Sequence, residues 1–330
     1  MSLASLKFDV ASIATVRDAA FSSGMYTHPG MYSACCMSPM STTANASAAG
    51  QITLGGDLTV NRIGFGAMRI TGPGIWGPPA DVSEAVRVVQ RAVQLGVNFI
   101  DTADSYGPDV SESIIAQALY PYPADLVIAT KGGLVRPGPD VWNRNGHPKH
   151  LREACEGSLR RLRRDRIDVY QLHSVDPGVP LSDSVGELVR LQTEGKIRHI
   201  GISNVTLDQL KQAERLTPIV SVQNRFNLED RRADAVVEYC ARKSIAFIPW
   251  APLDSGRHAR QAGSGGALAR IAARHGVSVG SAAIAWLLQH SNVMLPIPGT
   301  GLVKHLEENV AAASIRLTPE EMRELGALRG

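Results

Sequence analysis

The sequence predicts an α/β fold, a (β/α)8 TIM barrel that begins with a β-hairpin and ends with extra helices. Two observations predict it. Short apolar runs alternate with amphipathic segments from residue 51 onward, and the alternation supplies eight strand candidates. Regular strand–helix alternation is typical of a parallel sheet, and eight such units can close into a barrel. A chain of 330 residues is also ordinary for a barrel built as one domain.

The strands are expected in chain order, after the hairpin. Residues 52–60, ITLGGDLTV, are two short alternating runs around Gly55-Gly56, which predicts a hairpin with its turn there. The eight strand candidates then cover residues 62–68, 97–101, 125–131, 167–173, 197–203, 218–223, 245–250 and 293–298.

Helical patterns lie between the strand candidates. Residues 81–96, DVSEAVRVVQRAVQLG, place apolar side chains every three or four positions, as one face of a helix does. Residues 150–165 and 183–195 repeat the pattern and carry basic residues or glycine near their ends, as helix C-termini prefer.

The competing architecture is an open, doubly wound sheet with a dinucleotide fingerprint. Residues 72–77, GPGIWG, match the GxGxxG spacing of that fingerprint. However, Pro73 lies inside the match, Pro78 and Pro79 follow it, and no helical pattern starts there. We therefore interpret the match as a chance occurrence in a surface loop and favour the barrel.

The first 50 residues differ from the rest of the chain. They include MYSACCMSPMSTTANASAAG, a stretch rich in Ser, Ala, Thr and Met without charge, and they lack the basic, apolar and cleavage regions of a signal peptide in order. Residues 1–50 are expected to be a poorly ordered extension, and residues 51–330 the barrel domain. An N-terminal arm that packs on a partner subunit is the alternative.

Composition excludes several classes of partner. The net charge is +3, from 34 basic and 31 acidic residues, so no nucleic acid or membrane partner is expected. The basic run at residues 160–166 is better explained as a solvated helix end. The four cysteines form neither a disulfide framework nor a spaced metal site, which favours a cytoplasmic location. The oligomeric state stays open.

Residues able to bind a ligand or transfer protons gather at one end of the predicted strands. Active sites of barrels lie at the C-terminal ends of their strands. Reading those ends in order gives Asp101, Lys131, His173, Ser203, Asn204, Gln223 and Trp250, with Tyr106 five positions after Asp101.

These side chains suggest a general acid that faces a carbonyl oxygen. A lysine ammonium beside a phenol favours the phenolate and lowers the tyrosine pKa, and Asp101 would keep Lys131 charged. His173 would donate to the substrate oxygen or relay a proton. A hydride from a nicotinamide would complete the reaction at carbon. Ser203, Asn204 and Gln223 could hold its carboxamide, and Trp250 could stack on its ring.

The same residues lie in motifs that resemble the aldo-keto reductase family. The motifs are GFGAM, NFIDTADSYG, IATKGG, DVYQLHSVDP, GISN, VQNRFN, PWAPL and PIPGTGLVKHLEENV, and the resemblance covers nearly all of the chain from residue 52 to the C-terminus. The resemblance implies a barrel whose hairpin closes its bottom, with NADP(H) bound over the top. It implies that Tyr106 is the proton donor, Lys131 tunes it, Asp101 pairs with Lys131, and His173 orients the carbonyl.

The resemblance also implies a set of cofactor contacts. Gly299 and His305 depart from the family pattern, because many members carry Lys and Arg there, and histidine holds a 2′-phosphate less firmly than a guanidinium. Backbone amides at the start of the following helix could still bind that phosphate. The implied contacts are Ala67, Met68, Ser203, Asn204, Gln223, Trp250, Pro252, Leu253, Gly299, Thr300, His305, Glu308 and Asn309.

Residues 70–79 and 118–131 resemble the bacterial pyridoxal reductases (pyridoxine 4-dehydrogenases) of this family. This resemblance implies an NADPH-dependent reductase of aldehydes or ketones, with pyridoxal as a candidate substrate. Trp76 would then cover the substrate pocket, or it is an exposed residue of a rigid turn. The substrate loops are expected around Trp76, Trp142, Val175 and Asp254.

Two other functions stay open. A cofactor-binding regulatory subunit would resemble the potassium-channel β-subunits that share this fold, but those lack the histidine at the position of His173. A barrel lyase or hydrolase without a redox cofactor would need metal ligands or paired carboxylates, and the sequence suggests neither.

Overall fold

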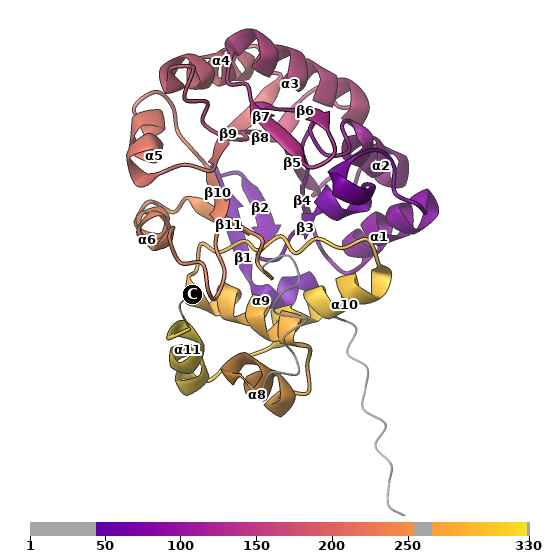
Figure 1. The fold of residues 1–330 in the computed structure, drawn as a ribbon, viewed down its shortest axis with the longest axis vertical. Coiled ribbons are helices and arrows are strands. Elements are labelled where there is room, and N and C mark those ends of the chain that lie inside the picture. The colour runs from indigo at the N-terminus through magenta and orange to yellow at the C-terminus, as the bar shows by residue number, and fades with distance from the viewer. Residues whose placement is uncertain (1–43, 254–265, 329–330) are drawn as a thin grey trace, which may run out of the picture. The chain divides into compact units, whose positions relative to one another are not determined.

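Seven parallel strands form the centre of the molecule (Figure 1), in the order β11-β10-β9-β8-β5-β4-β3. The computed structural model describes residues 44–253 and 266–328, so Asp254, one of the predicted loop positions, lies outside the described residues. Helices cover the outer face of the sheet. The strands are β3 (Phe65–Gly66), β4 (Phe99–Asp101), β5 (Val127–Gly132), β8 (Ile167–Leu172), β9 (Ile197–Ser203), β10 (Ser221–Arg225) and β11 (Ala246–Trp250).

The eighth predicted strand closes the barrel without forming a regular strand. The Phe247 amide donates to the Val293 carbonyl, and the Leu295 amide donates to the Phe247 carbonyl, both at 2.9 Å. The Gly64 amide, just before β3, donates to the Pro296 carbonyl at 2.9 Å. The segment therefore joins both edges of the sheet. Its prolines lack the amide protons that a longer ladder requires. The predicted (β/α)8 barrel is confirmed.

The predicted hairpin is confirmed, and its apolar side chains pack on the barrel interior. β1 (Gln51–Leu54) pairs antiparallel with β2 (Leu58–Asn61). Leu54 and Leu58 are buried in one cluster with residues of β5, β8 and β11. Gly55 is required at the turn, because its φ is +62° and a Cβ there would lie 2.3 Å from the His199 ring.

The helices follow the predicted alternation, and GPGIWG contains only a 3-10 turn, after which the next helix, α1, begins at Val82. One element was not predicted, a second hairpin of β6 (Leu134–Gly138) and β7 (Val141–Arg144). Within the described ranges no single helix could span a membrane by length and hydropathy, although the bent pair α8–α9 passes when joined. The helices are η1 (Ala46–Ala49), η2 (Ala67–Ile70), η3 (Pro73–Ile75), α1 (Val82–Gln94), α2 (Val110–Leu119), α3 (Pro148–Leu162), α4 (Leu181–Thr193), α5 (Leu207–Glu214), α6 (Asp234–Lys243), α8 (Ala267–Arg274), α9 (Val279–His290), α10 (Val303–Ala311), η6 (Ala312–Ser314) and α11 (Pro319–Gly326).

The expected boundary at residue 50 is wrong for the residues just before it. Ala46 in η1 is fully buried, and its amide donates to the Leu95 carbonyl at 2.8 Å. Arg316 donates to the Ala48 carbonyl at 2.8 Å. The small alanines allow this turn to pack on the barrel, so residues 44–50 belong to it. Residues 1–43 lie outside the described part of the chain.

Arg62, just before β3, hydrogen-bonds to the C-terminal part of the barrel, and replacing its side chain should destabilise the fold. Its guanidinium donates to the carbonyls of Leu288 and Ser291 at 2.6 Å and of Met294 at 3.2 Å. Arg62→Met would leave these carbonyls without that partner. We expect the free energy of unfolding in urea to fall by about 2 kcal/mol. Arg87→Met, which removes only exposed ion pairs, should change it by less than about 1 kcal/mol. Equal losses would contradict this role.

Candidate active site

A buried lysine organises the C-terminal end of the strands. Lys131, in β5, is fully buried, and its ammonium has three acceptors for its three protons. Nζ lies 2.6 Å from Asp101 Oδ1, 2.8 Å from the Thr102 carbonyl and 3.3 Å from the Tyr106 hydroxyl. Because Lys131 donates to the Tyr106 oxygen, the phenol hydrogen is available to another acceptor. The predicted Asp101–Lys131–Tyr106 cluster therefore exists in the structure.

Two glutamines complete the surroundings of Asp101. Its Oδ2 accepts from Gln171 Nε2 at 3.0 Å and from Gln223 Nε2 at 2.8 Å. Gln171 was not predicted as a site residue, although it lies two positions before His173 and so shares its face of the strand. Gln223 was expected to hold a carboxamide. Its amide nitrogen instead binds Asp101, which leaves its amide oxygen for a ligand.

Burial decides the protonation of the phenol. Burial raises the pKa of Tyr106 above its usual value, and the Lys131 charge only partly opposes this. The expectation that Lys131 lowers the pKa of Tyr106 is therefore wrong, because the net shift is upward. Burial acts to lower the pKa of Lys131 itself, but Asp101 and Tyr106 together outweigh it and the net direction is upward. A neutral phenol thus lies beside a charged ammonium.

His173 faces the phenol as a neutral imidazole. The rings of Tyr106 and His173 lie 5.8 Å apart between centroids and nearly perpendicular, at 80°. Burial, with a contribution from the Lys131 charge, lowers the pKa of His173 well below its ordinary value. Ser105 Oγ lies 3.3 Å from Nδ1. Because Nδ1 of this neutral ring is hydrogen-bonded to Ser105, Nε2 is left for a second partner.

The predicted carboxamide and stacking residues form a connected group beside His173. Asn204 adopts the left-handed conformation, with φ at +56°, and its Nδ2 donates to the His173 carbonyl at 3.0 Å. Its Oδ1 accepts from the Trp250 indole at 3.0 Å, which fixes that ring. Ser203 Oγ donates to the Gln223 carbonyl at 2.8 Å. The Arg225 guanidinium, which the sequence analysis missed, lies 5.5 Å from the centre of the Trp250 ring.

The comparisons with known proteins agree with this arrangement. The model of the aldo/keto reductase family matches residues 62–329. The chain belongs to the aldo/keto reductase family. It is 51% identical over 285 residues to an uncharacterized oxidoreductase of Schizosaccharomyces pombe, covering 86% of this chain and 92% of that protein. It is 40% identical over 279 residues to pyridoxine 4-dehydrogenase of Escherichia coli, covering 83% and 96%.

Solved structures of the family share the fold. An aldo-keto reductase from Klebsiella pneumoniae, solved in complex with NADPH, superposes with a TM-score of 0.71 at 27% identity. The match covers 83% of this chain and 93% of that one. The fold and the family membership together make the chain an oxidoreductase.

The departure from the family pattern at Gly299 has a steric reason. A Cβ on Gly299 would lie 2.5 Å from the Gly66 carbonyl oxygen, and one on Gly66 would lie 2.5 Å from the Ile297 carbonyl oxygen. The two backbones therefore meet too closely for the lysine that many family members carry. Arg69 supplies a cation nearby, because its Cγ lies 3.7 Å from the position of a Gly299 Cβ and its side chain is exposed.

The start of α10 differs from the expectation. The Val303 amide, one of those expected to bind a cofactor phosphate, donates to Glu84 Oε1 at 3.1 Å. This hydrogen bond is the largest cause of the lowered pKa of Glu84, so the group is a carboxylate. Thr300 is buried, and its hydroxyl accepts from the Leu302 amide at 3.1 Å. A negative charge therefore already occupies part of this helix start.

The remaining predicted residues directly follow β3 or β11, or belong to α10. Ala67 and Met68 form the start of η2, directly after β3, and the Ala67 carbonyl accepts from Ser111 Oγ at 3.0 Å. Pro252 and Leu253 follow β11 at the edge of the described residues. The other three are in α10, and they are His305, Glu308 and Asn309.

A second buried acid network, which the sequence analysis missed, lies behind Tyr106. Glu112 is fully buried and accepts from Thr130 Oγ1 at 2.5 Å and Arg161 Nε at 2.7 Å. Asp104 is buried beside it, and within the described residues its Oδ1 has no hydrogen-bond partner. Burial, followed by the Glu112 charge, raises the pKa of Asp104 to about 8. Asp104 is therefore a neutral acid at neutral pH.

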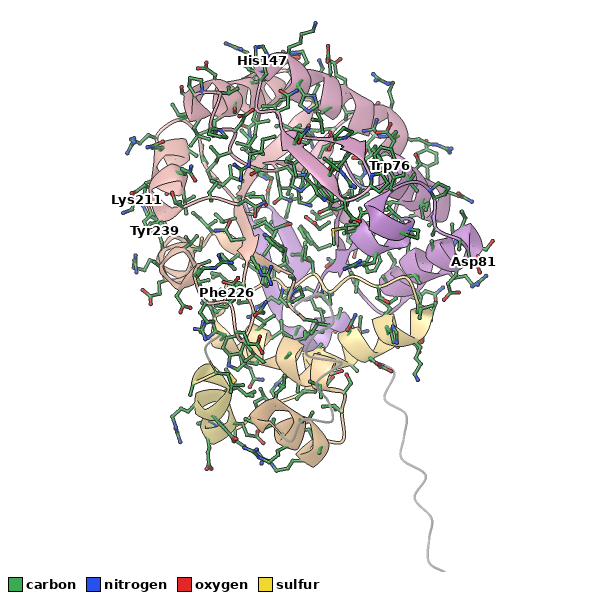
Figure 2. The ribbon with its side chains drawn as sticks, in the orientation of Figure 1. Trp76, Asp81, His147, Lys211, Phe226 and Tyr239 are labelled. Carbon is green, nitrogen blue, oxygen red and sulfur yellow. The ribbon has the colours of Figure 1, made fainter. Side chains whose placement is uncertain are left out.

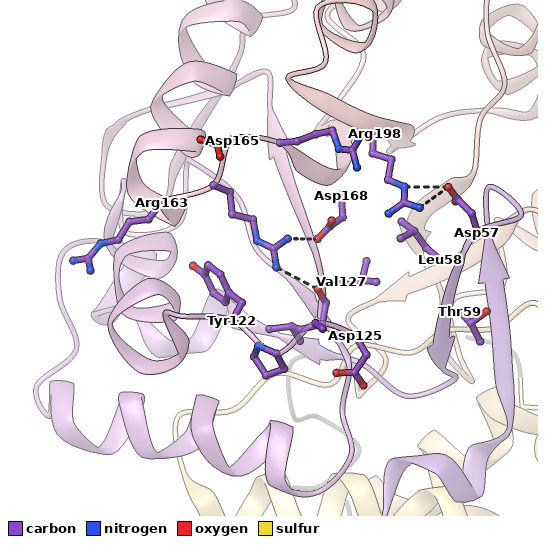
Figure 3. Close-up of a pocket in the computed structure, with 15 residues that line it drawn as sticks. Asp57, Leu58, Thr59, Tyr122, Asp125, Val127, Arg163, Asp165, Asp168 and Arg198 are labelled. Carbon is purple, nitrogen blue, oxygen red and sulfur yellow. Dashed lines mark hydrogen bonds and ion pairs between the residues drawn. The ribbon is translucent and has the colours of Figure 1, made fainter.

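A large hollow at the opposite end of the barrel is not this site (Figure 3). It measures about 620 Å³ and is lined by the hairpin turn and the first residues of β5, β8 and β9. Two of its arginines are paired, Arg164 with Asp168 at 3.0 Å and Arg198 with Asp57 at 2.6 Å. This end of a barrel commonly serves stability. In the described part of the chain, no cluster of His, Cys, Asp and Glu could hold a metal.

The raised pKa of Asp104 predicts how stability depends on pH. The unfolded carboxyl ionises near its usual value of 3.8, whereas the folded one stays protonated up to about 8. The contribution of Asp104 is therefore intact below pH 4 and is lost as pH rises to 8. Relative to Asp104→Asn, the wild type should lose stability on the order of 1 kcal/mol per pH unit across this window. Urea unfolding of both proteins at pH 5, 6.5 and 8 measures it, and parallel curves would contradict a buried, protonated Asp104.

Proposed function

We propose that this protein is an NADP(H)-dependent reductase of aldehydes or ketones in which Tyr106 donates a proton to the carbonyl oxygen. The hydrogen bond from Lys131 to the Tyr106 oxygen carries the proposal, because it leaves the phenol hydrogen for the substrate. His173, a neutral ring facing the phenol, is the second donor to that oxygen. The substrate carbonyl would accept from both.

The site is suited to the charge that develops during proton transfer. As Tyr106 gives up its proton, negative charge collects on its oxygen, and the Lys131 ammonium at 3.3 Å stabilises it. Asp101 keeps Lys131 charged, and the two glutamines hold Asp101 in place. These groups are already oriented before the substrate binds, so little reorganisation is needed.

The residues around Trp250 fit a nicotinamide cofactor. The indole is fixed by Asn204 and presents a flat surface for a ring, while Ser203 and the Gln223 oxygen lie beside it. The bound cofactor would supply the hydride to the carbonyl carbon. The solved relatives from Klebsiella pneumoniae with NADPH and with NADP support this choice.

Pyridoxal is the substrate that the comparisons favour. Pyridoxine 4-dehydrogenase of Escherichia coli is 40% identical and is covered over 96% of its length. Reduction of the pyridoxal aldehyde gives the pyridoxine alcohol, which is a carbonyl reduction of the proposed kind. A regulatory subunit without catalysis is the weaker candidate, because the proton donor, its lysine and the facing histidine are all in place.

Tyr106→Phe tests the proposed role of the phenol. We expect kcat with NADPH and pyridoxal or 4-nitrobenzaldehyde to fall by roughly 10²- to 10⁴-fold, as on removal of a general acid. The dissociation constant for NADPH, measured by fluorescence titration, should stay unchanged. Tyr122→Phe, which removes a phenol at the far end of the barrel, is the matched control. Full activity in Tyr106→Phe would refute the role.

The charges near α10 predict opposite effects on cofactor affinity. Glu84→Gln keeps an acceptor for the Val303 amide but removes a negative charge, so NADPH should bind roughly two- to fivefold more tightly. Arg69→Gln should weaken NADPH binding by a similar factor. Neither change should alter NADH affinity by as much, because NADH lacks the 2′-phosphate. Equal shifts for the two cofactors in fluorescence titrations would contradict a phosphate position here.

A further inference from the structure

Arg136, in β6, is a buried cation held by backbone carbonyls. Only 9% of the residue is exposed, and within the described ranges it forms no ion pair. Its Nε donates to Val141 O at 2.9 Å, and its Nη2 donates to Gly74 O at 2.8 Å. Its Nη1 donates to both Ile75 O, at 2.9 Å, and Ser105 O, at 3.1 Å. One guanidinium therefore joins three loops at the rim.

The guanidinium also contacts two tryptophans. Its central carbon lies 3.6 Å from the centre of the Trp142 ring and 5.8 Å from that of Trp76. Trp142 belongs to the β6–β7 hairpin, and Trp76 lies beside that hairpin in Figure 2. Trp76 is itself bridged to Gly107, next to Tyr106. Arg136 thus lies close to both indoles.

Trp142 lies directly beside the reacting groups. Its ring centre is 6.3 Å from that of Tyr106 and 6.4 Å from that of His173, and both rings are steeply inclined to it, at 81° and 71°. The side chain is half-buried. Arg136 also binds the carbonyl of Ser105, whose hydroxyl contacts His173. The indole is therefore one wall of the space in front of the phenol.

Stability alone is a poor reason for this arrangement. Burying a guanidinium with no carboxylate in ion-pair contact has a large desolvation cost, and burial lowers the pKa of Arg136 although the Asp140 charge opposes the shift. Carbonyl dipoles and indole faces offset part of that cost. The arrangement of Arg136 across three loops is better explained by a role of Trp142 in substrate binding.

On the basis of the proposed function, we propose that Arg136 is a positioning residue that fixes Trp142 as a rigid wall, and that this wall selects flat, ring-bearing aldehydes over small aliphatic ones. An indole held in one place offers a ring substrate a large contact area at little entropic cost. A small aliphatic aldehyde reaches Tyr106 and His173 without using that surface. Selection therefore rests on Trp142, and Arg136 acts through it.

The test compares KM and kcat for 4-nitrobenzaldehyde and propanal with NADPH. In Arg136→Met and in Trp142→Ala, KM for 4-nitrobenzaldehyde should rise tenfold or more, while KM for propanal changes less than twofold. Arg136→Lys should recover only part of the loss, because an ammonium lacks the fixed fork that reaches four carbonyls. NADPH affinity by fluorescence titration should stay constant in all three variants.

Arg164→Met is the matched control. Arg164 likewise lies over an aromatic ring, 4.6 Å from the centre of Tyr122, and donates to a backbone carbonyl, that of Leu126. It lies at the opposite end of the barrel. Both KM values should stay at their wild-type levels in this variant.

The outcomes separate this inference from the proposed function. If Trp142→Ala raises KM equally for both aldehydes, or for neither, selection by the indole is wrong while the reductase proposal stands. Trp142→Ala decides this point even if Arg136→Met fails to fold by circular dichroism. If KM for 4-nitrobenzaldehyde alone rises in Trp142→Ala but not in a folded Arg136→Met, the positioning role is wrong. A wild type that reduces neither aldehyde with NADPH would overturn the proposed function, and this inference with it.

Discussion

The ion pair between Lys131 and Asp101 is the constraint on which the rest of the site depends. The two side chains are 0% and 2% exposed, and their atoms meet at 2.6 Å. Removing either partner from such a pair leaves a buried charge alone, which typically costs about 3–5 kcal/mol. The surrounding residues follow from this need. Gln171 and Gln223 satisfy the second carboxylate oxygen, and the Thr102 carbonyl and the Tyr106 hydroxyl satisfy the ammonium.

The pair also sets the chemistry of its neighbours. The ammonium lies against the phenol oxygen and works against protonation of His173, while burial keeps both Tyr106 and His173 uncharged. The site therefore combines one fixed positive charge with two neutral donors that face each other. Under the proposed function, such a site would bind a neutral carbonyl without opposing charge and would stabilise negative charge only as the proton moves, as catalysis requires.

The sequence predicted the barrel, its hairpin and the cluster of Asp101, Tyr106 and Lys131 because periodicity and strand ends are local features. It missed what depends on contacts between distant segments. Glu84 accepts a hydrogen bond from the Val303 amide, 219 positions away in the sequence, and no local pattern predicts that bond. The β6–β7 hairpin is interrupted by Pro137 and Gly138, which hide its alternation. The direction of the Tyr106 pKa depends on how completely the folded chain excludes water, and residue types alone do not show this. The order of the strands, by contrast, followed directly from their alternation with helices.

The central claim is that the phenol of Tyr106 stays protonated beside a charged lysine. A titration of ¹³C-labelled tyrosine, followed by NMR, tests it most directly, because the one of the seven tyrosine signals that disappears in Tyr106→Phe identifies the residue. The account predicts that this signal titrates above the ordinary value of 10.0. Titration below that value would show that Lys131 outweighs burial, and it would contradict the account of a neutral proton donor held by a buried ion pair.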